Sequence, residues 1–213
     1  MKKFLALAVG GFVALAASAA SAATYSNKAS FGPSNADFSG PAISVAGFNT
    51  ALGTLNAVTV SLDGDARPEG DISNQMYNTR SFTFYMATEV TVTSSAVSVS
   101  GININLHSSQ AYTDVPPYES RPYAPAPPFG YAILPGKPSD FLTSTVSFTP
   151  TTVTSYLVTD GINVGVDITE PVSGTVTVTY SYSAPVTTVP EPASMALLGI
   201  GLAGLGLIRR RSV

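Results

Sequence analysis

The sequence predicts an all-β protein, an antiparallel β-sandwich flanked by an N-terminal signal helix and a C-terminal hydrophobic helix. In the central region, apolar β-branched residues alternate with Ser and Thr over several short runs. This is the pattern of strands with one buried and one wet face. Gly, Asn, Asp and Pro separate the runs, as expected for turns between the strands of two packed sheets. No central stretch shows the 3.6-residue period of an amphipathic helix.

The alternating runs define the expected strands. They cover residues 57–62, 82–93, 97–106, 146–148, 162–168 and 175–182. Gly101 interrupts the third run, where a bulge or turn would shift the register. A β-solenoid is the competing architecture, but it requires a repeat of fixed length, and the sequence shows none.

Residues 107–140 interrupt this pattern, because they hold eight of the chain's sixteen prolines. Proline lacks the backbone donor that a central strand needs, so we expect a long Pro/Tyr-rich loop. Aromatic residues alternate with these prolines and are candidate contacts for a ligand or partner: Tyr112, Tyr118, Tyr123, Phe129 and Tyr131. Such rings could stack on sugar rings of a matrix polysaccharide, or they could pack the loop onto a sheet.

Composition excludes several classes of site. The chain has 213 residues, no Cys and one His, so it has no disulfides, no Cys-ligated metal and no thiol nucleophile. Residues 24–189 carry five basic and twelve acidic side chains, a formal charge of −7. This charge disfavours nucleic acid as a partner.

The first 23 residues have the three parts of a secretory signal peptide. Lys2 and Lys3 precede an apolar run, 4–17, that is short for a membrane span. Small residues follow and fit the small-x-small rule for signal peptidase at Ala20, Ala22 and Ala23. We therefore expect cleavage and export, with a retained membrane anchor as the alternative.

The C-terminus carries a second apolar segment. Residues 193–208 hold no charge and would form a helix of about 24 Å, shorter than the ~30 Å hydrocarbon core. Arg209, Arg210 and Arg211 follow and would hold this end on the cytoplasmic side of the inner membrane. Physical chemistry alone thus predicts an exported domain held by a short tail, with a permanent single-span anchor as one reading.

Residues 190–213 resemble a PEP-CTERM sorting tail. The resemblance rests on the triplet Pro190, Glu191 and Pro192, the apolar stretch after it and the terminal Arg cluster, in that order. It implies processing by a membrane enzyme of the exosortase type, which removes the tail. It also implies release to the cell surface or exopolysaccharide matrix of a Gram-negative bacterium.

A second resemblance lies within the central domain, 24–189. Residues 48–60 and the run 175–182 are similar to the opening and the closing strand of the choice-of-anchor E type of exported domain. This resemblance implies a surface β domain with an interchangeable anchor. It implies no chemical activity.

The residues that could support chemistry are few. His107 has no Gly-x-Ser-x-Gly elbow nearby, so we expect no enzyme and no resident cofactor. The segment 63–71 contains four carboxylates, which are either calcium ligands or part of a solvated turn: Asp63, Asp65, Glu69 and Asp71. The sequence therefore predicts an exported surface or matrix protein of structural or interaction type. The alternative is a carbohydrate-binding module of the exopolysaccharide matrix, with Ca²⁺ as its one possible cofactor.

Overall fold

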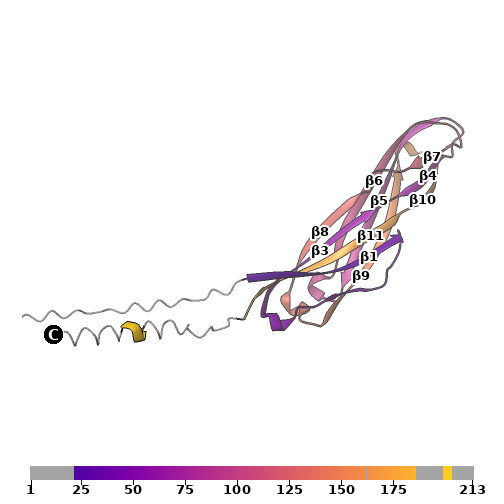
Figure 1. Cartoon of the computed structure of the whole chain (residues 1–213). Helices are drawn as coiled ribbons and strands as arrows, with labels where there is room; N and C mark the ends of the chain where they lie inside the picture. The colour runs from indigo at the N-terminus through magenta and orange to yellow at the C-terminus, as the bar shows by residue number, and fades with distance from the viewer. Residues whose placement is uncertain (1–21, 162, 186–198, 203–213) are drawn as a thin grey trace, which may run out of the picture. The chain divides into compact units, whose positions relative to one another are not determined.

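The computed structural model describes residues 22–161, 163–185 and 199–202 (Figure 1). Ser21–Ala184 form one compact unit, and the strands of the described residues lie within it. They are β1 (Ala22–Asn35), β2 (Ile43–Ala46), β3 (Thr54–Ala66), β4 (Glu69–Asn74), β5 (Arg80–Ser94), β6 (Ile102–Val115), β7 (Ser120–Tyr123), β8 (Phe129–Gly136), β9 (Thr145–Val158), β10 (Val164–Thr169) and β11 (Pro171–Ser183). Four short 3₁₀ turns accompany them: η1 (Thr50–Leu52), η2 (Val97–Val99), η3 (Pro138–Phe141) and η4 (Thr159–Gly161).

The predicted antiparallel β class is confirmed in the described residues. The strands form sheet A, in the order β1-β11-β3-β8, sheet B, β2-β9-β5-β6, and sheet C, β10-β4-β7. Every pairing within these sheets is antiparallel. The third predicted strand begins later than expected, because residues 97–99 form η2 and β6 starts after Gly101.

Sheet C continues sheet A beyond a break in three neighbouring strands. The pairs β10/β11, β4/β3 and β7/β8 are consecutive in the chain, so the two sheets share one strand order. Pro68, Pro171 and the prolines of residues 125–128 lie at or beside the three breaks, and proline removes the donors that a continuous ladder needs. Backbone bonds still connect the parts, since Arg67 N–H donates to Pro171 O at 3.0 Å. Figure 1 shows β5, β6 and β9 running past this break.

Two hydrophobic clusters lie between the layers. The larger cluster joins sheets A and B and includes Leu62, Val90 and Val178. The smaller cluster joins sheet C to the far ends of β5 and β6 and includes Ile72 and Phe84. Alternation places these side chains inward and Ser and Thr outward, which is the two-layer packing that the sequence predicts.

The prediction of a loop over 107–140 is wrong. This segment contains the end of β6, all of β7 and β8, and η3. Proline is compatible with these strands because β7 and β8 are edge strands of sheets C and A. The remaining prolines of the segment lie in the connections between strands or at the start of η3.

The two helices predicted at the ends of the chain fall mostly outside the described residues. The predicted signal helix and most of the predicted helix 193–208 fall there, although residues 199–202 are helical. None of the helices within the described ranges has the length and apolarity that a membrane crossing requires.

Candidate functional site

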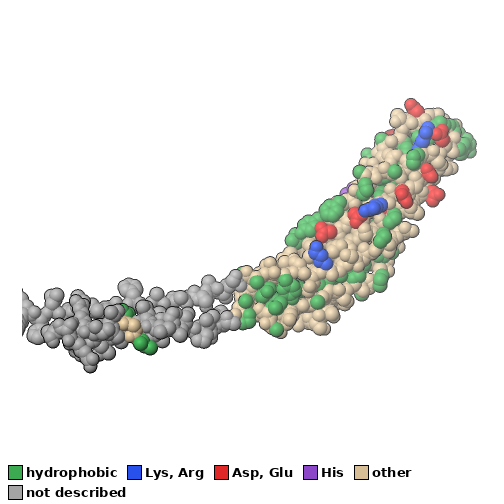
Figure 2. All heavy atoms as spheres, in the orientation of Figure 1, with side chains coloured by type: hydrophobic (Ala, Val, Ile, Leu, Met, Phe, Trp, Pro, Cys, Tyr) green, Lys and Arg blue, Asp and Glu red, His purple; other side chains and the backbone are tan. Residues whose placement is uncertain are grey.

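One edge of sheet A presents a row of large apolar side chains to solvent. Alternation along β8 turns Phe129, Tyr131 and Ile133 outward, with exposed fractions of 67%, 55% and 54%. Large apolar side chains rarely stay this exposed in a contiguous row unless the surface contacts something. Figure 2 shows hydrophobic side chains gathered over β8, beside acidic ones on the same face.

The neighbouring strand places carboxylates directly against this row. In the β3–β8 register, Asp65 is the partner of Phe129 and Asp63 is the partner of Tyr131. Asp65 is held in place because Ser173 Oγ donates to its Oδ1 at 2.7 Å and Arg67 Nε lies 3.5 Å from its Oδ2. We call the outward side of β8 and β3, from Phe129 to Ile133 and from Asp65 to Asp63, the β8 face.

A groove of about 260 Å³ adjoins the β8 face. The side chains along it include Ser30, Asp63, Asp65, Phe129, Ser173 and Thr175. Its floor is bare backbone without side chains, because Gly64 and Gly174 are register partners there. A Cβ on Gly64 would lie only 2.5 Å from Ile104 Cδ1, so the inner face has no room for a side chain. The groove thus combines hydroxyls, carboxylates and an aromatic ring, the mixture with which a polyhydroxylated ligand can be both stacked and hydrogen-bonded.

The four predicted calcium ligands separate into two pairs. Asp63 and Asp65 lie on β3 of sheet A, whereas Glu69 and Asp71 lie on β4 of sheet C. The segment is therefore two strands with a break at Arg67 and Pro68, and the expected turn is wrong. Within the described residues, no group of three or more His, Asp or Glu side chains lies close enough to hold a metal ion.

Burial divides the predicted aromatic contacts. Tyr112 and Tyr123 pack in the smaller cluster with exposed fractions of 7% and 0%, so they belong to the core. Their hydroxyls are satisfied there, since Tyr112 donates to Pro122 O at 3.2 Å and Tyr123 bonds Ser108 Oγ at 2.8 Å. Burial raises the pKa of both tyrosines above their usual range. Only Tyr118, Phe129 and Tyr131 of the predicted set are exposed.

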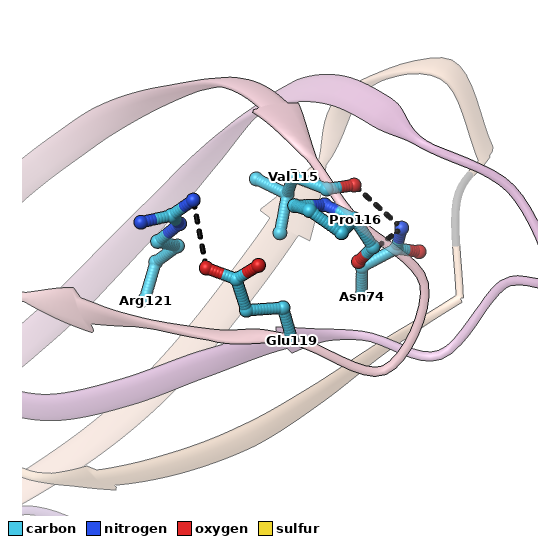
Figure 3. A network of polar contacts seen from close by, with 5 residues as sticks. All are labelled: Asn74, Val115, Pro116, Glu119 and Arg121. Carbon is cyan, nitrogen blue, oxygen red and sulfur yellow. Dashed lines mark hydrogen bonds and ion pairs between the residues drawn. The ribbon is translucent and has the colours of Figure 1, made fainter.

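Tyr118 lies at the tip of the unit, far from the β8 face. It pairs edge-on with Tyr77, which is 88% exposed, at a ring distance of 5.8 Å. Buried Asn74 holds the two loops together, because its Nδ2 lies within 3.1 Å of the carbonyl oxygens of Val115 and Pro116 (Figure 3). The same Nδ2 lies 2.9 Å from the carbonyl oxygen of Asn78. The tip is thus supported by a buried hydrogen-bond network.

His107 lies on the outward side of β6, in sheet B. It borders a groove of about 560 Å³ whose lining includes Tyr85, Ala87, His107, Ser109, Ser155 and Leu157. The groove is shallow and mostly apolar, and it lies on the outward side of sheet B, whereas the β8 face lies on the outward side of sheet A.

Sequence reasoning missed one buried carboxylate, Glu170, between the two core clusters. Its side chain is 5% exposed, and Thr88 and Thr154 donate to its Oε2 at 2.6 and 3.1 Å. Burial raises the pKa of Glu170, an effect that these two hydrogen bonds partly offset and that nearby Asp37 reinforces. A lone Glu before a proline gives no local signal of burial, because its position depends on the break between sheets A and C.

Both predicted processing sites border the compact unit. Ala22 and Ala23 begin β1 and pair with Ser183 and Tyr182, so cleavage after either would remove at most two residues of this strand. Ala20 lies outside the described residues, as do Pro190, Glu191, Pro192, Arg209, Arg210 and Arg211.

The comparisons with known proteins recognise the tail alone. The PEP-CTERM protein-sorting motif matches residues 188–211. No curated protein and no solved structure matches the chain. The motif is that of an exported protein sorted by an exosortase-type enzyme, held at the membrane and then cleaved.

Proposed function

We propose that the chain is a structural or interaction protein of the cell surface or extracellular matrix of a Gram-negative bacterium, without enzymatic activity. Signal peptidase removes the first 22 or 23 residues, and the tail holds the protein in the inner membrane until the exosortase-type enzyme acts. The observation that carries this proposal is the boundary between fold and tail. The compact unit ends at Ala184, and the motif begins at residue 188, so the tail can be removed without breaking a strand.

The two halves of the choice-of-anchor E resemblance support the same assignment. The opening segment supplies buried Phe48 and the first half of β3, and the closing segment is most of β11. These strands are direct neighbours, with Thr59 opposite Thr179. We infer a β-sandwich of this type, in which the two segments form the middle of sheet A.

Intact mass and cell fractionation in the native host test the sorting step. We expect the surface or matrix form to begin at residue 23 or 24 and to lack the apolar tail. The variant Glu191→Ala should accumulate in the membrane fraction with the tail attached. A surface form that retains residues 193–213 would overturn the proposal and identify a permanent anchor.

Polysaccharide binding at the β8 face is the second candidate function. The specific observation is that Phe129 and Tyr131 meet Asp65 and Asp63 across one strand pair, beside the groove. An aromatic ring can cover the apolar face of a sugar, while carboxylates and hydroxyls accept and donate hydrogen bonds at its rim. The matrix exopolysaccharide is the natural ligand for such a face.

Binding of residues 24–185 to the matrix polysaccharide and to a glycan array tests this function. The double variant Phe129→Ala/Tyr131→Ala should weaken binding by about tenfold or more, since each ring is an anchor of the face. Tyr77→Ala removes a still more exposed ring elsewhere and should leave binding unchanged. Each measurement is run with Ca²⁺ and with chelator, because a calcium-assisted site predicts a loss in chelator alone. Equal binding by the double variant and wild type would eliminate the β8 face.

A further inference from the structure

The groove beside the β8 face runs across the strands of sheet A. The strand registers set polar and aromatic side chains of its lining in two parallel rows, one of Ser30, Thr175 and Asp63, and one of Ser173, Asp65 and Phe129. Together the rows span β1, β11, β3 and β8. Neighbouring strands lie about 4.8 Å apart, so three such spacings give the groove a length of about 14 Å. This length suits a short stretch of a linear polymer laid across the strands.

Two carboxylates lie on opposite sides of the middle of this groove. Asp63 and Asp65 flank Gly64, and alternate residues on one face of a strand are about 7 Å apart. In the part of the chain that the structure describes, no Lys or Arg forms an ion pair with Asp63. The groove therefore places negative charge between hydroxyl groups and an aromatic ring.

Basic side chains lie around the groove but do not line it. Arg67 Nε is 3.5 Å from Asp65 Oδ2, but the Arg67 side chain is 76% exposed, and an ion pair this exposed contributes little. Lys28 lies two residues along β1 from Ser30, outside the groove. Acidic side chains also outnumber basic ones over residues 24–189. A polymer of acidic sugars would thus meet like charge in the groove and over the domain as a whole.

We propose that the β8 face selects a polysaccharide with free amino groups, and that one ammonium group of this polymer bridges Asp63 and Asp65. The inference rests on the proposed binding of polysaccharide at this face and names its ligand class. An ammonium has three donors, and its hydrogen bonds to carboxylates are about 2.7–2.9 Å long, so it fits between two carboxylates at this spacing. Phe129, at one end of the groove, covers the apolar face of a neighbouring sugar ring. An N-acetylated sugar keeps the ring and the hydroxyls but lacks the charge.

Calorimetric titration of residues 24–185 with three oligosaccharides of equal length tests this selectivity. The probes are oligomers of glucosamine, of N-acetylglucosamine and of galacturonic acid. Wild type should bind the glucosamine oligomer about tenfold or more tightly than the N-acetylated one, and should bind the acidic one least. Asp63→Thr should weaken glucosamine binding by about tenfold and leave N-acetylglucosamine binding unchanged. Asp167→Thr removes the same charge from an exposed position of β10 and should keep the wild-type preference.

The outcomes separate this inference from the proposed binding of polysaccharide. Equal binding of the glucosamine and N-acetylglucosamine oligomers, with both weakened in Phe129→Ala/Tyr131→Ala, would keep the β8 face as a glycan site and overturn its selectivity. Equal weakening of glucosamine binding by Asp63→Thr and Asp167→Thr would also overturn it, because net charge alone would then explain the preference. No binding of the glucosamine oligomer overturns the inference whatever other glycans bind. Loss of all glycan binding in wild type would remove the proposed function itself.

Discussion

Replacing Asn74 with alanine should destabilise the whole domain, although this residue does not touch the proposed binding surface. Its side chain is fully buried, its Nδ2 faces three carbonyl oxygens at 2.9–3.1 Å, and its Oδ1 accepts from Met76 N–H at 2.9 Å. Because an amide has two donor hydrogens, these contacts amount to about three hydrogen bonds. At about 1 kcal/mol each, the loss of unfolding free energy is about 3 kcal/mol. For a domain of this size, the melting temperature should fall by about 6–12 °C.

Urea and thermal unfolding of residues 24–185, followed by circular dichroism, measure this loss. Asn78→Ala is the matched control, because Asn78 is an exposed residue of the same tip and its side chain bonds only Arg80 Nε at 3.0 Å. This control should change stability by less than about 0.5 kcal/mol. Asn74→Asp should be at least as damaging as Asn74→Ala near neutral pH, since it sets a negative charge against carbonyl oxygens. If Asn74→Ala matches Asn78→Ala, the tip is not held by this network and the reasoning is refuted.

Two further predictions concern buried ionisable groups. Because burial raises the pKa of Glu170, the folded state favours the protonated acid. The contribution of Glu170 to stability should therefore be fully present at low pH and be lost as pH rises through that pKa. Glu170→Gln should flatten this decline in a series of urea melts, and an unchanged pH profile would contradict the buried position. Burial, with a smaller contribution from Tyr25, raises the pKa of Tyr180 to about 12. A spectrophotometric titration of wild type should therefore show fewer tyrosines ionised near pH 11 than if all of them were exposed to solvent. Tyr180→Phe should cost about 1 kcal/mol through loss of the 2.8 Å bond to Ala46 O, and an equal stability in urea would show that this bond contributes nothing.

The sequence predicted strands well where a run alternates and lies between two neighbours. The run 175–182 is part of β11, which pairs with β1 on one side and β3 on the other. The prediction from sequence was wrong where proline was taken to exclude a strand. The strands β7 and β8 lie at sheet edges, where the missing backbone N–H of proline is tolerated. Edge position is a property of the whole sheet, and no local pattern reports it.

For the candidate site too, the sequence identified residues that only the fold brings together. Phe129, Tyr131, Asp63 and Asp65 were singled out separately, as aromatic contacts and as metal ligands, about 65 residues apart in the chain. The β3–β8 register brings them together. Tyr123 is not part of this set, because it lies on the preceding strand, β7, and its side chain packs in the smaller cluster.

The β class, the absence of cysteine chemistry and the sorting tail can all be inferred from the sequence, because each depends on residue types or on their spacing over a few positions. Alternation with period two, small residues before a cleavage site and a Pro-Glu-Pro triplet before an apolar stretch are all read within a few residues. Tertiary structure alone decided which aromatic rings face solvent and where the carboxylates meet them. These features depend on which strands pair and in what register, and pairing joins residues such as Ala22 and Ser183 that lie at opposite ends of the domain's sequence.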